Sequence, residues 1–303
     1  MSNDAGSAIV FVNRCAGGGN AGRKIAGVRA EFARQGFAVR FVESRSAKDF
    51  RRGVCAAIAA GSRTLIAMGG DGTLQLLVRE AIGSPVNAGV IPVGGGNDFA
   101  AALGVRNWKQ AVEIVAKGKT RAVDVVRATF ANGETAEYLG GGGVGLDAEA
   151  ARYARGKFLK WPGRLRYVAS AVAALRGYSG VHVEFAFPEN GAPALRKRLL
   201  LAAALNTPSY GGGLRLAPEA RIDDGQLDFV TIDMLSRREM ARLLPRLLFT
   251  GELQTGHLTR FRVTRARLSA EEELGGFHGD GELLGATPVE IEVLPKAIRM
   301  FAP

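Results

Sequence analysis

Short apolar runs alternate with longer amphipathic stretches through the first 127 residues of the chain. Apolar runs of strand length lie at residues 9–12, 38–42, 64–68 and 88–92. Amphipathic stretches with helical spacing lie between them, at 24–34, 48–60 and 74–82. Strands that alternate with helices in this way predict βαβ units, and therefore an α/β domain with a doubly wound, mostly parallel sheet.

The second half has a different pattern, because residues 181–187 alternate between apolar and polar side chains. Turn residues at 189–191 then lead into the apolar run 199–205, as in an antiparallel hairpin with a long loop. Further strands are predicted at 227–232, 258–268 and 289–294, with one helix at about 237–249. We therefore expect an α/β domain over 1–128 and an antiparallel, β-rich domain over 129–288.

The composition fits two globular domains that meet an anionic partner. Hydrophobic residues make up 47% of the 303 residues, enough for well-formed cores. Lys and Arg number 40 against 29 Asp and Glu, which gives a net charge of +11. Such a surplus attracts nucleic acid, phospholipid head groups or a phosphorylated ligand.

Cysteine content and hydropathy indicate a cytoplasmic protein. Cys15 and Cys55 are too few for a disulfide scaffold or a zinc site in a chain of this length. Residues 1–7 lack the layout of a signal peptide, and the apolar run 199–205 is too short to span a bilayer. Any contact with the inner face of the membrane is therefore expected to be peripheral.

The sequence GGDGT at residues 69–73 follows a predicted strand and precedes a predicted helix. Glycines let the backbone approach a phosphate, and the helix start supplies amide donors and a favourable dipole. Asp71 would repel bound phosphates unless it meets a metal ion or accepts a proton. Its presence therefore favours chemistry over simple nucleotide storage.

A second glycine turn, PVGGGNDFA at residues 92–100, follows the next predicted strand. Two such turns at the carboxyl ends of neighbouring parallel strands would face one crevice, where open α/β sheets bind ligands. A rival interpretation is dinucleotide binding, since residues 17–22 fit G-x-G-x-x-G and Glu43 could bind a ribose. That rival explains neither Asp71 nor the pair Asn97 and Asp98.

Two acidic turns in the second half allow either a structural or a chemical interpretation. Residues 223–225 (DDG) could be a solvated turn, or could offer oxygen ligands to Mg²⁺. Residues 279–282 (GDGE) could be a hairpin turn, or could supply a general base through Asp280 or Glu282. The three histidines have no spacing typical of a metal site or a serine triad.

The whole chain resembles the bacterial lipid kinases built on the diacylglycerol kinase catalytic domain. GGDGT is shared with the related NAD kinases, but residues 92–100 are closer to the lipid kinase pattern Pro-x-Gly-Thr-x-Asn-Asp-Phe-Ala. Segments 143–148, 217–228 and 280–282 follow in the family's order. The chain departs from the pattern at Arg14, Gly95 and Leu146, where the family has proline, threonine and phenylalanine.

The resemblance implies a sandwich-like second domain, a cleft between the domains that holds the active site, and a segment 289–303 that completes the first domain. It implies ATP and Mg²⁺ as cofactors, with Asp280 or Glu282 as the base and Asp71 holding the phosphates and metal. The nucleotide would be bound by Asn13, Gly69, Gly70, Asp71, Gly72, Thr73, Gly94, Gly95, Gly96, Asn97 and Asp98. A second Mg²⁺ could sit on Asp224 and the carbonyls of Arg221 and Gln226.

Residues 150–183 contain no acidic residue, but they contain seven Lys and Arg interleaved with aromatic residues. This pattern is typical of a segment that lies on an anionic membrane surface, although a basic helix packed on the second domain would share it. No RNA-binding or helix-turn-helix signature accompanies it, so nucleic acid is not the expected partner.

Three hypotheses remain at this point. The protein could be an ATP-dependent lipid kinase acting on diacylglycerol, phosphatidylglycerol or a similar lipid. It could be a soluble kinase of NAD or another small molecule, or a lipid or nucleic-acid binder without catalytic activity. No sequence feature indicates an oligomeric state.

Overall fold

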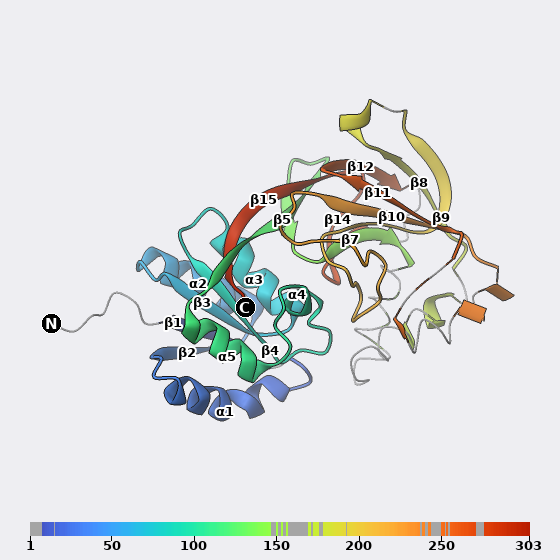
Figure 1. The fold of residues 1–303 in the computed structure, drawn as a ribbon. Helices are drawn as coiled ribbons and strands as arrows, with labels where there is room; N and C mark the ends of the chain where they lie inside the picture. The colour runs from blue at the N-terminus through green and yellow to red at the C-terminus, as the bar shows by residue number, and fades with distance from the viewer. Residues whose placement is uncertain are drawn as a thin grey trace. The chain divides into compact units, whose positions relative to one another are not determined.

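The computed structural model describes residues 8–14, 16–146, 178–191, 193–236, 255–270 and 276–303, with shorter pieces at 150, 153, 156, 169–170, 172–175, 238–239, 242–243, 250–251 and 253. The chain forms two compact units. The first comprises Met1–Val123 and Lys296–Pro303, and the second comprises Asp124–Pro295. Strands β5 (Thr120–Phe130) and β15 (Val289–Phe301) each run from one unit into the other (Figure 1).

The first unit is a parallel sheet with helices on both faces. Its strands are β1 (Ala8–Asn13), β2 (Val39–Ser44), β3 (Thr64–Gly69) and β4 (Asn87–Pro92), in the order β4-β3-β1-β2. The end of β15 adds to β4 in parallel at Arg299 and Met300. The helices are α1 (Asn20–Arg34), α2 (Ala47–Ala59), α3 (Asp71–Ala81), α4 (Asp98–Ala102) and α5 (Trp108–Lys117). Because α2 packs against α3, and α1 against α5, the doubly wound prediction is confirmed.

The second unit is built from antiparallel strands, as predicted. These are β6 (Thr135–Tyr138), β7 (Gly141–Gly145), β8 (Val181–Ala186), β9 (Leu195–Leu205), β10 (Leu227–Asp233), β11 (Leu258–Val263), β12 (Arg265–Ala270), β13 (Phe277–Gly279) and β14 (Glu282–Gly285), with most of β5 and β15. The predicted hairpin is β8 and β9, joined through a short 3₁₀ helix at Pro188–Asn190.

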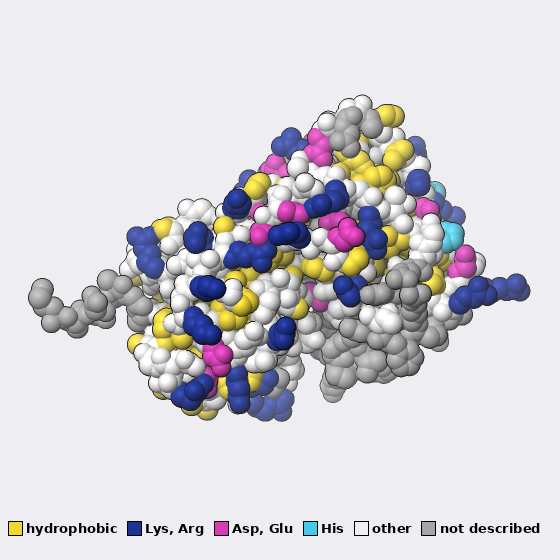
Figure 2. Space-filling view, in the orientation of Figure 1, with side chains coloured by type: hydrophobic (Ala, Val, Ile, Leu, Met, Phe, Trp, Pro, Cys, Tyr) yellow, Lys and Arg dark blue, Asp and Glu magenta, His cyan; other side chains and the backbone are white. Residues whose placement is uncertain are grey.

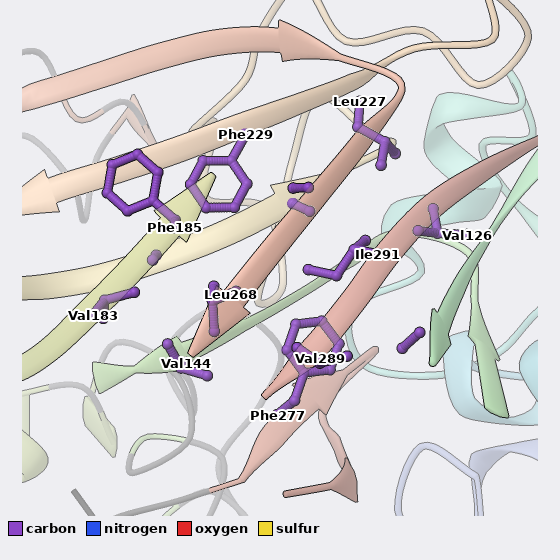
Figure 3. Close-up of a cluster of buried hydrophobic side chains, with 14 of the residues drawn as sticks. Val126, Val144, Val183, Phe185, Leu227, Phe229, Leu268, Phe277, Val289 and Ile291 are labelled. Atoms are coloured by element: carbon purple, nitrogen blue, oxygen red, sulfur yellow. The ribbon is translucent and has the colours of Figure 1, made fainter. Parts of the chain in front are cut away.

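The hydrophobic pattern of β8 and β9 follows from what covers each strand. Val183 and Phe185 of β8 join the main core, in which Phe229 and Phe277 also lie (Figure 3), whereas His182 and Glu184 are exposed. Strand β9 contributes alternate residues to that core and to a second cluster around Leu216 and Ile232. A strand buried on both faces has a continuous apolar run, which explains why 199–205 does not alternate.

The strands of the structure differ from the predicted ones in several places. The run 258–268 forms two strands that are separated at Thr264, whose backbone N–H donates to Glu189 Oε1 at 2.8 Å. Strand β7 was not predicted because its sequence, GGGVG, is rich in the residue least favoured in strands. The predicted helix at 237–249 lies mostly outside the described residues.

Candidate active site

The first glycine loop connects β3 directly to α3. Gly70 is the N-cap of α3, and a Cβ atom on Gly69 would lie 2.3 Å from Thr73 Oγ1, so only glycine fits there. Thr73 Oγ1 in turn accepts a hydrogen bond from Asn13 Nδ2 at 3.1 Å. Asn13 ends β1, the parallel neighbour of β3, so the loop and the β1 terminus form one surface.

The second glycine loop is in contact with the first. The register of β3 and β4 places Pro92 beside Gly69, and the amides of Val93 and Gly94 donate to the Gly69 carbonyl at 2.9 and 3.2 Å. A Cβ atom on Gly94 would lie 2.4 Å from Gly70 Cα. The two loops therefore touch through their backbones, and a side chain at residue 94 would force them apart.

Asn97 closes the second loop on itself. Its backbone has a φ of 61°, in the left-handed region that Asn tolerates better than most residues. Its Oδ1 accepts from Gly94 N at 3.1 Å, and its Nδ2 donates to Gly94 O at 3.0 Å. These two hydrogen bonds fix the turn that precedes α4.

Asp71 bridges the two loops. Its carboxylate accepts hydrogen bonds from Asp98 N at 3.2 Å and from Phe99 N at 3.1 Å, which are the first amides of α4. A carboxylate there satisfies amide donors that have no partner within the helix. This position gives Asp71 a structural role in joining the loops, in addition to the phosphate and metal role that the resemblance implies.

A pocket of about 490 Å³ borders the second loop within the first unit. Its lining residues are Gly96, Asn97, Ala101, Gly104, Val105, Arg106, Gln110 and Pro303. Among the predicted nucleotide residues, Gly96 and Asn97 contribute to this pocket.

The rival ribose acid, Glu43, is engaged elsewhere. It forms an exposed ion pair with Arg14 Nη1 at 2.8 Å, at the end of β2. Arg14 is one of the departures from the lipid kinase pattern, and in this chain it ties the loop after β1 to β2.

In the second unit, Asp280 forms the tip of the β13–β14 hairpin, with a φ of 50°. Its Oδ2 accepts from Leu139 N at 2.8 Å, and its Oδ1 accepts from Gly140 N and Gly141 N at 2.8 and 3.2 Å. Asp280 N donates to Gly141 O at 2.9 Å. Three backbone amides of the turn between β6 and β7 therefore donate to the Asp280 carboxylate.

The buried side chain of Tyr138 lies close enough to Asp280 to be affected by its charge. Tyr138 is fully buried and donates through its hydroxyl to Ala204 O at 3.2 Å. Burial and, second to it, the charge of Asp280 raise the pKa of Tyr138 well above its usual value.

Glu282 differs from Asp280 in being exposed. It begins β14, opposite Gly279 of β13. Among the described residues, its carboxylate has no hydrogen-bond partner. The Glu282 side chain is therefore more accessible to solvent than that of Asp280.

The loop 221–226 forms hydrogen bonds with Asp124, a buried acid that was not singled out from the sequence. Asp124 is fully buried on β5. Its backbone N–H donates to Ile222 O, and its Oδ2 accepts from Gly225 N, both at 2.7 Å. The sequence signal was a single aspartate within the apolar run Val123–Val126, a position where a charge is costly unless it has partners.

Within the same loop, Asp224 already has a cationic partner. Its Oδ2 forms an ion pair with Arg262 of β11, and its Oδ1 accepts from Gln226 N at 3.1 Å. Arg221 lies beside Asp223, with Nε 3.6 Å from Oδ1. The structure therefore brings Arg221, Asp224 and Gln226 into one short loop, whereas Asp280 and Glu282 lie on a separate hairpin.

Asp228 is a second buried acid close to this loop. Burial raises its pKa, Arg262 acts in the opposite direction, and the charge of Asp224 adds to the rise. Within the part of the chain that the structure describes, no group of three or more His, Cys, Asp or Glu is arranged to hold a metal ion. A cation at this loop would depend on carbonyl oxygens as well as on Asp224.

The comparisons with known proteins cover both units. The diacylglycerol kinase catalytic domain matches residues 7–128. The YegS C-terminal NAD kinase beta sandwich-like domain matches residues 140–302. The fold and these two domain matches place the chain among kinases, and the second matched domain is described as similar to the β-sandwich of NAD kinases.

Individual relatives show which kinds of kinase the chain is similar to. The chain is 30% identical over 305 residues to a diacylglycerol kinase of Mycobacterium tuberculosis, across 99% of this chain and 96% of that one. It is 31% identical over 268 residues to a YegS-like lipid kinase of Stenotrophomonas maltophilia, across 84% of each chain. The fold is that of a diacylglycerol kinase crystal structure from Bacillus anthracis, with a TM-score of 0.73 at 19% identity over 98% of this chain and 97% of that one. The chain belongs to the diacylglycerol kinase catalytic-domain family of bacterial lipid kinases, which confirms the resemblance seen in its motifs.

Proposed function

We propose that this protein transfers the γ-phosphoryl group of ATP to a hydroxyl group of a membrane lipid such as diacylglycerol or phosphatidylglycerol. The observation that carries the proposal is the pair of glycine loops, which touch at Gly70 and Gly94 and are bridged by the Asp71 carboxylate. Two backbone loops without side chains at their contact are suited to bind a chain of phosphates.

The nucleotide phosphates would lie along residues 69–73 and 94–97. Phosphoryl transfer depends on positioning and charge neutralisation more than on covalent help from the protein. The hydrogen bonds between the Gly94 backbone and the Asn97 side chain hold the second loop without the threonine that the family has at residue 95. Backbone amides are therefore the expected phosphate donors at Gly95 in this chain.

Glu282 is the better candidate for the general base. A base must reach the hydroxyl proton of the acceptor, and the Glu282 carboxylate is exposed and unengaged among the described residues. Asp280, whose carboxylate accepts three backbone amides, would fix the hairpin that presents Glu282.

Mg²⁺ is the expected metal, and it would supply charge neutralisation between the phosphates of ATP. A second ion would be held by the Asp224 carboxylate with the carbonyls of Arg221 and Gln226. This oxygen donor set fits Mg²⁺, since hard cations prefer oxygen ligands. The pairing of Asp224 with Arg262 means that a divalent cation would compete with a guanidinium group there.

The lipid acceptor requires contact with a membrane surface. None of the helices in the described ranges is long and apolar enough to cross a membrane. The visible face carries Lys and Arg side chains spread among acidic ones (Figure 2). The concentrated positive charge is instead in the sequence 152–176, whose Lys and Arg residues lie outside the described residues. We infer that this segment attracts the anionic inner face of the cytoplasmic membrane.

The proposal is tested by incubating the protein with labelled ATP and Mg²⁺ and offering diacylglycerol, phosphatidylglycerol, a sphingoid base and NAD in turn. We expect label in one or more lipids, and a loss of at least 100-fold in Glu282→Gln. Glu290→Gln, which alters an exposed glutamate on β15, is the matched control and should retain full activity. Label that enters NAD alone would replace the lipid proposal with a small-molecule kinase.

A further inference from the structure

Asn206 lies immediately after β9 and is fully buried in the second unit. Its side-chain Nδ2 donates to Leu139 O at 2.9 Å and to Asp124 O at 3.3 Å. Its backbone N–H donates to Gly140 O at 2.8 Å. One residue thus contacts both β5 and the turn between β6 and β7.

The orientation of this carboxamide is fixed by its partners. Both groups that face Nδ2 are carbonyl oxygens, which only a donor can satisfy. The opposite atom, Oδ1, is buried and has no hydrogen-bond partner among the described residues. A buried acceptor without a donor lowers the stability of the fold. Asn206 therefore keeps the two hydrogen bonds that Nδ2 donates, while Oδ1 stays without a donor among the described residues.

The carbonyls that Asn206 holds belong to the peptide groups that bind Asp280. The Leu139 carbonyl and the Gly140 N–H form one planar peptide unit, and that N–H donates to Asp280 Oδ1 at 2.8 Å. The Gly140 carbonyl and the Gly141 N–H form the next unit, and that N–H donates to the same oxygen at 3.2 Å. In each of these two planar peptide units, the carbonyl oxygen therefore accepts a hydrogen bond from Asn206, and the N–H donates to Asp280.

The third contact of Asn206 leads to the loop 221–226. The Asp124 carbonyl belongs to the residue whose carboxylate accepts a hydrogen bond from Gly225 N at 2.7 Å. Asp224, next to Gly225, is paired with Arg262. Through Asp124 and Leu139, the Asn206 side chain joins the two acidic turns that the sequence analysis singled out separately.

We propose that Asn206 is a positioning residue that sets the hairpin carrying Asp280 and Glu282 in register with the loop 221–226. The part of this inference that concerns catalysis rests on the proposed function. Asn206 itself is enclosed by protein and acts only through the backbone planes that it orients. Loss of its donor should let the turn 139–141 relax and misplace Glu282.

Kinetics of three variants test the proposal. Asn206→Ala should lower kcat about 100-fold with the KM for ATP little changed, since a displacement of the order of 1 Å has effects of that size. In Asn206→Asp a carboxylate would face two carbonyl oxygens, whereas its protonated form can donate. Its kcat relative to wild type should therefore rise as the pH falls from 8 to 6, and that of Asn206→Ala should not.

Thr207→Val is the matched control. Thr207 is also fully buried, and its hydroxyl contacts Gly140 O at 3.2 Å and Ser209 O at 2.9 Å, without reaching Asp124. We expect its kcat to stay within about threefold of wild type. Equal losses in Thr207→Val and Asn206→Ala, or a flat pH response of Asn206→Asp, would overturn the proposal.

A measurement without substrates separates this inference from the proposed function. Amide hydrogen exchange at Gly140, whose peptide plane carries the Leu139 carbonyl, should be at least tenfold faster in Asn206→Ala than in wild type and unchanged in Thr207→Val. Unchanged exchange at this amide in Asn206→Ala would overturn the positioning role, whatever the enzyme assay shows. If wild type transfers no phosphoryl group, accelerated exchange still supports the structural coupling and only the proposed function fails.

Discussion

Asp71 and Asp280 use their carboxylates in the same way, although they lie in different units. Each accepts hydrogen bonds from consecutive backbone amides of a distant segment, at residues 98–99 and 139–141 respectively. Hydrogen bonds to a charged acceptor are stronger than neutral ones and hold the backbone firmly. We therefore interpret both aspartates as residues that place loops, and Glu282 as the acid left available for proton transfer.

Asp71→Asn tests this interpretation at the first loop pair. The variant loses the charge that favours the two amides and presents an NH₂ group toward at least one of them. We expect the free energy of unfolding to fall by about 2 kcal/mol and kcat to fall at least 100-fold. Urea unfolding and the lipid kinase assay measure the two effects. Unfolding and activity both equal to those of Glu290→Gln would contradict the bridging role.

Asp228→Asn tests the buried acid on β10. Because the folded-state pKa of Asp228 is raised, its contribution to stability is fully present below the unfolded pKa and is lost as the pH rises through the folded value. The variant removes this titration. Its free energy of unfolding, measured in urea between pH 4 and 7, should therefore improve relative to wild type as the pH rises. If the difference in unfolding free energy between variant and wild type stayed constant or shrank over that range, burial would not be the dominant effect on the pKa of Asp228.

At the scale of elements, the glycine loops depend on the parallel register of β3 and β4, which sets Gly69 beside Pro92. The sequence predicted both strands and the turns that follow them. It could not predict the backbone contact between Gly70 and Gly94, since that contact depends on how the strands pair. For the same reason the role of Asp71 as a partner of α4 emerged only in three dimensions.

Other elements show where local pattern is insufficient. Alternation identified β8, because a strand buried on one face alternates between apolar and polar residues. A continuous apolar run identified β9, because a strand buried on both faces has apolar residues at successive positions. The break between β11 and β12 is fixed by Glu189, which is 75 residues from Thr264 in sequence. The roles of Asp124 and Asn206 could not be predicted, because their hydrogen-bond partners are distant in the sequence.

Gly94→Ala tests the contact between the loops. A methyl group at residue 94 would lie 2.4 Å from Gly70 Cα, so one of the loops must move. We expect the KM for ATP to rise at least tenfold, with a lower melting temperature. Gly256→Ala is the control, since a Cβ atom there meets nothing within 4 Å. If both variants bind ATP as wild type does, the loop contact has no part in nucleotide binding.

At the scale of the whole molecule, we propose that the excess positive charge attracts the protein to an anionic membrane surface. The net charge is +11, and the family of the chain is that of lipid kinases. Electrostatic attraction to anionic lipid contributes about 1 kcal/mol per basic residue near the surface and is screened by salt. Membrane contact by this route should therefore be reversible and sensitive to ionic strength.

Sedimentation with anionic vesicles measures this attraction. Binding of wild type should weaken steeply between 50 and 500 mM NaCl. Reversal of charge at Lys157 and Lys160 should weaken it at low salt more than tenfold, whereas reversal at Arg196 and Arg198, which are exposed on β9, should have a smaller effect. Sedimentation that does not respond to salt would contradict an electrostatic origin.

The most direct test of the account compares ATP labelled in the γ-phosphate with ATP labelled in the α-phosphate, using vesicles that contain diacylglycerol and phosphatidylglycerol. We expect that γ-label enters the lipid extract with an equal amount of ADP formed, that α-label does not enter it, and that Glu282→Gln slows the transfer at least 100-fold. These expectations would be contradicted if no label reached any lipid while the same preparation phosphorylated NAD, or if Glu282→Gln transferred the γ-label as fast as wild type.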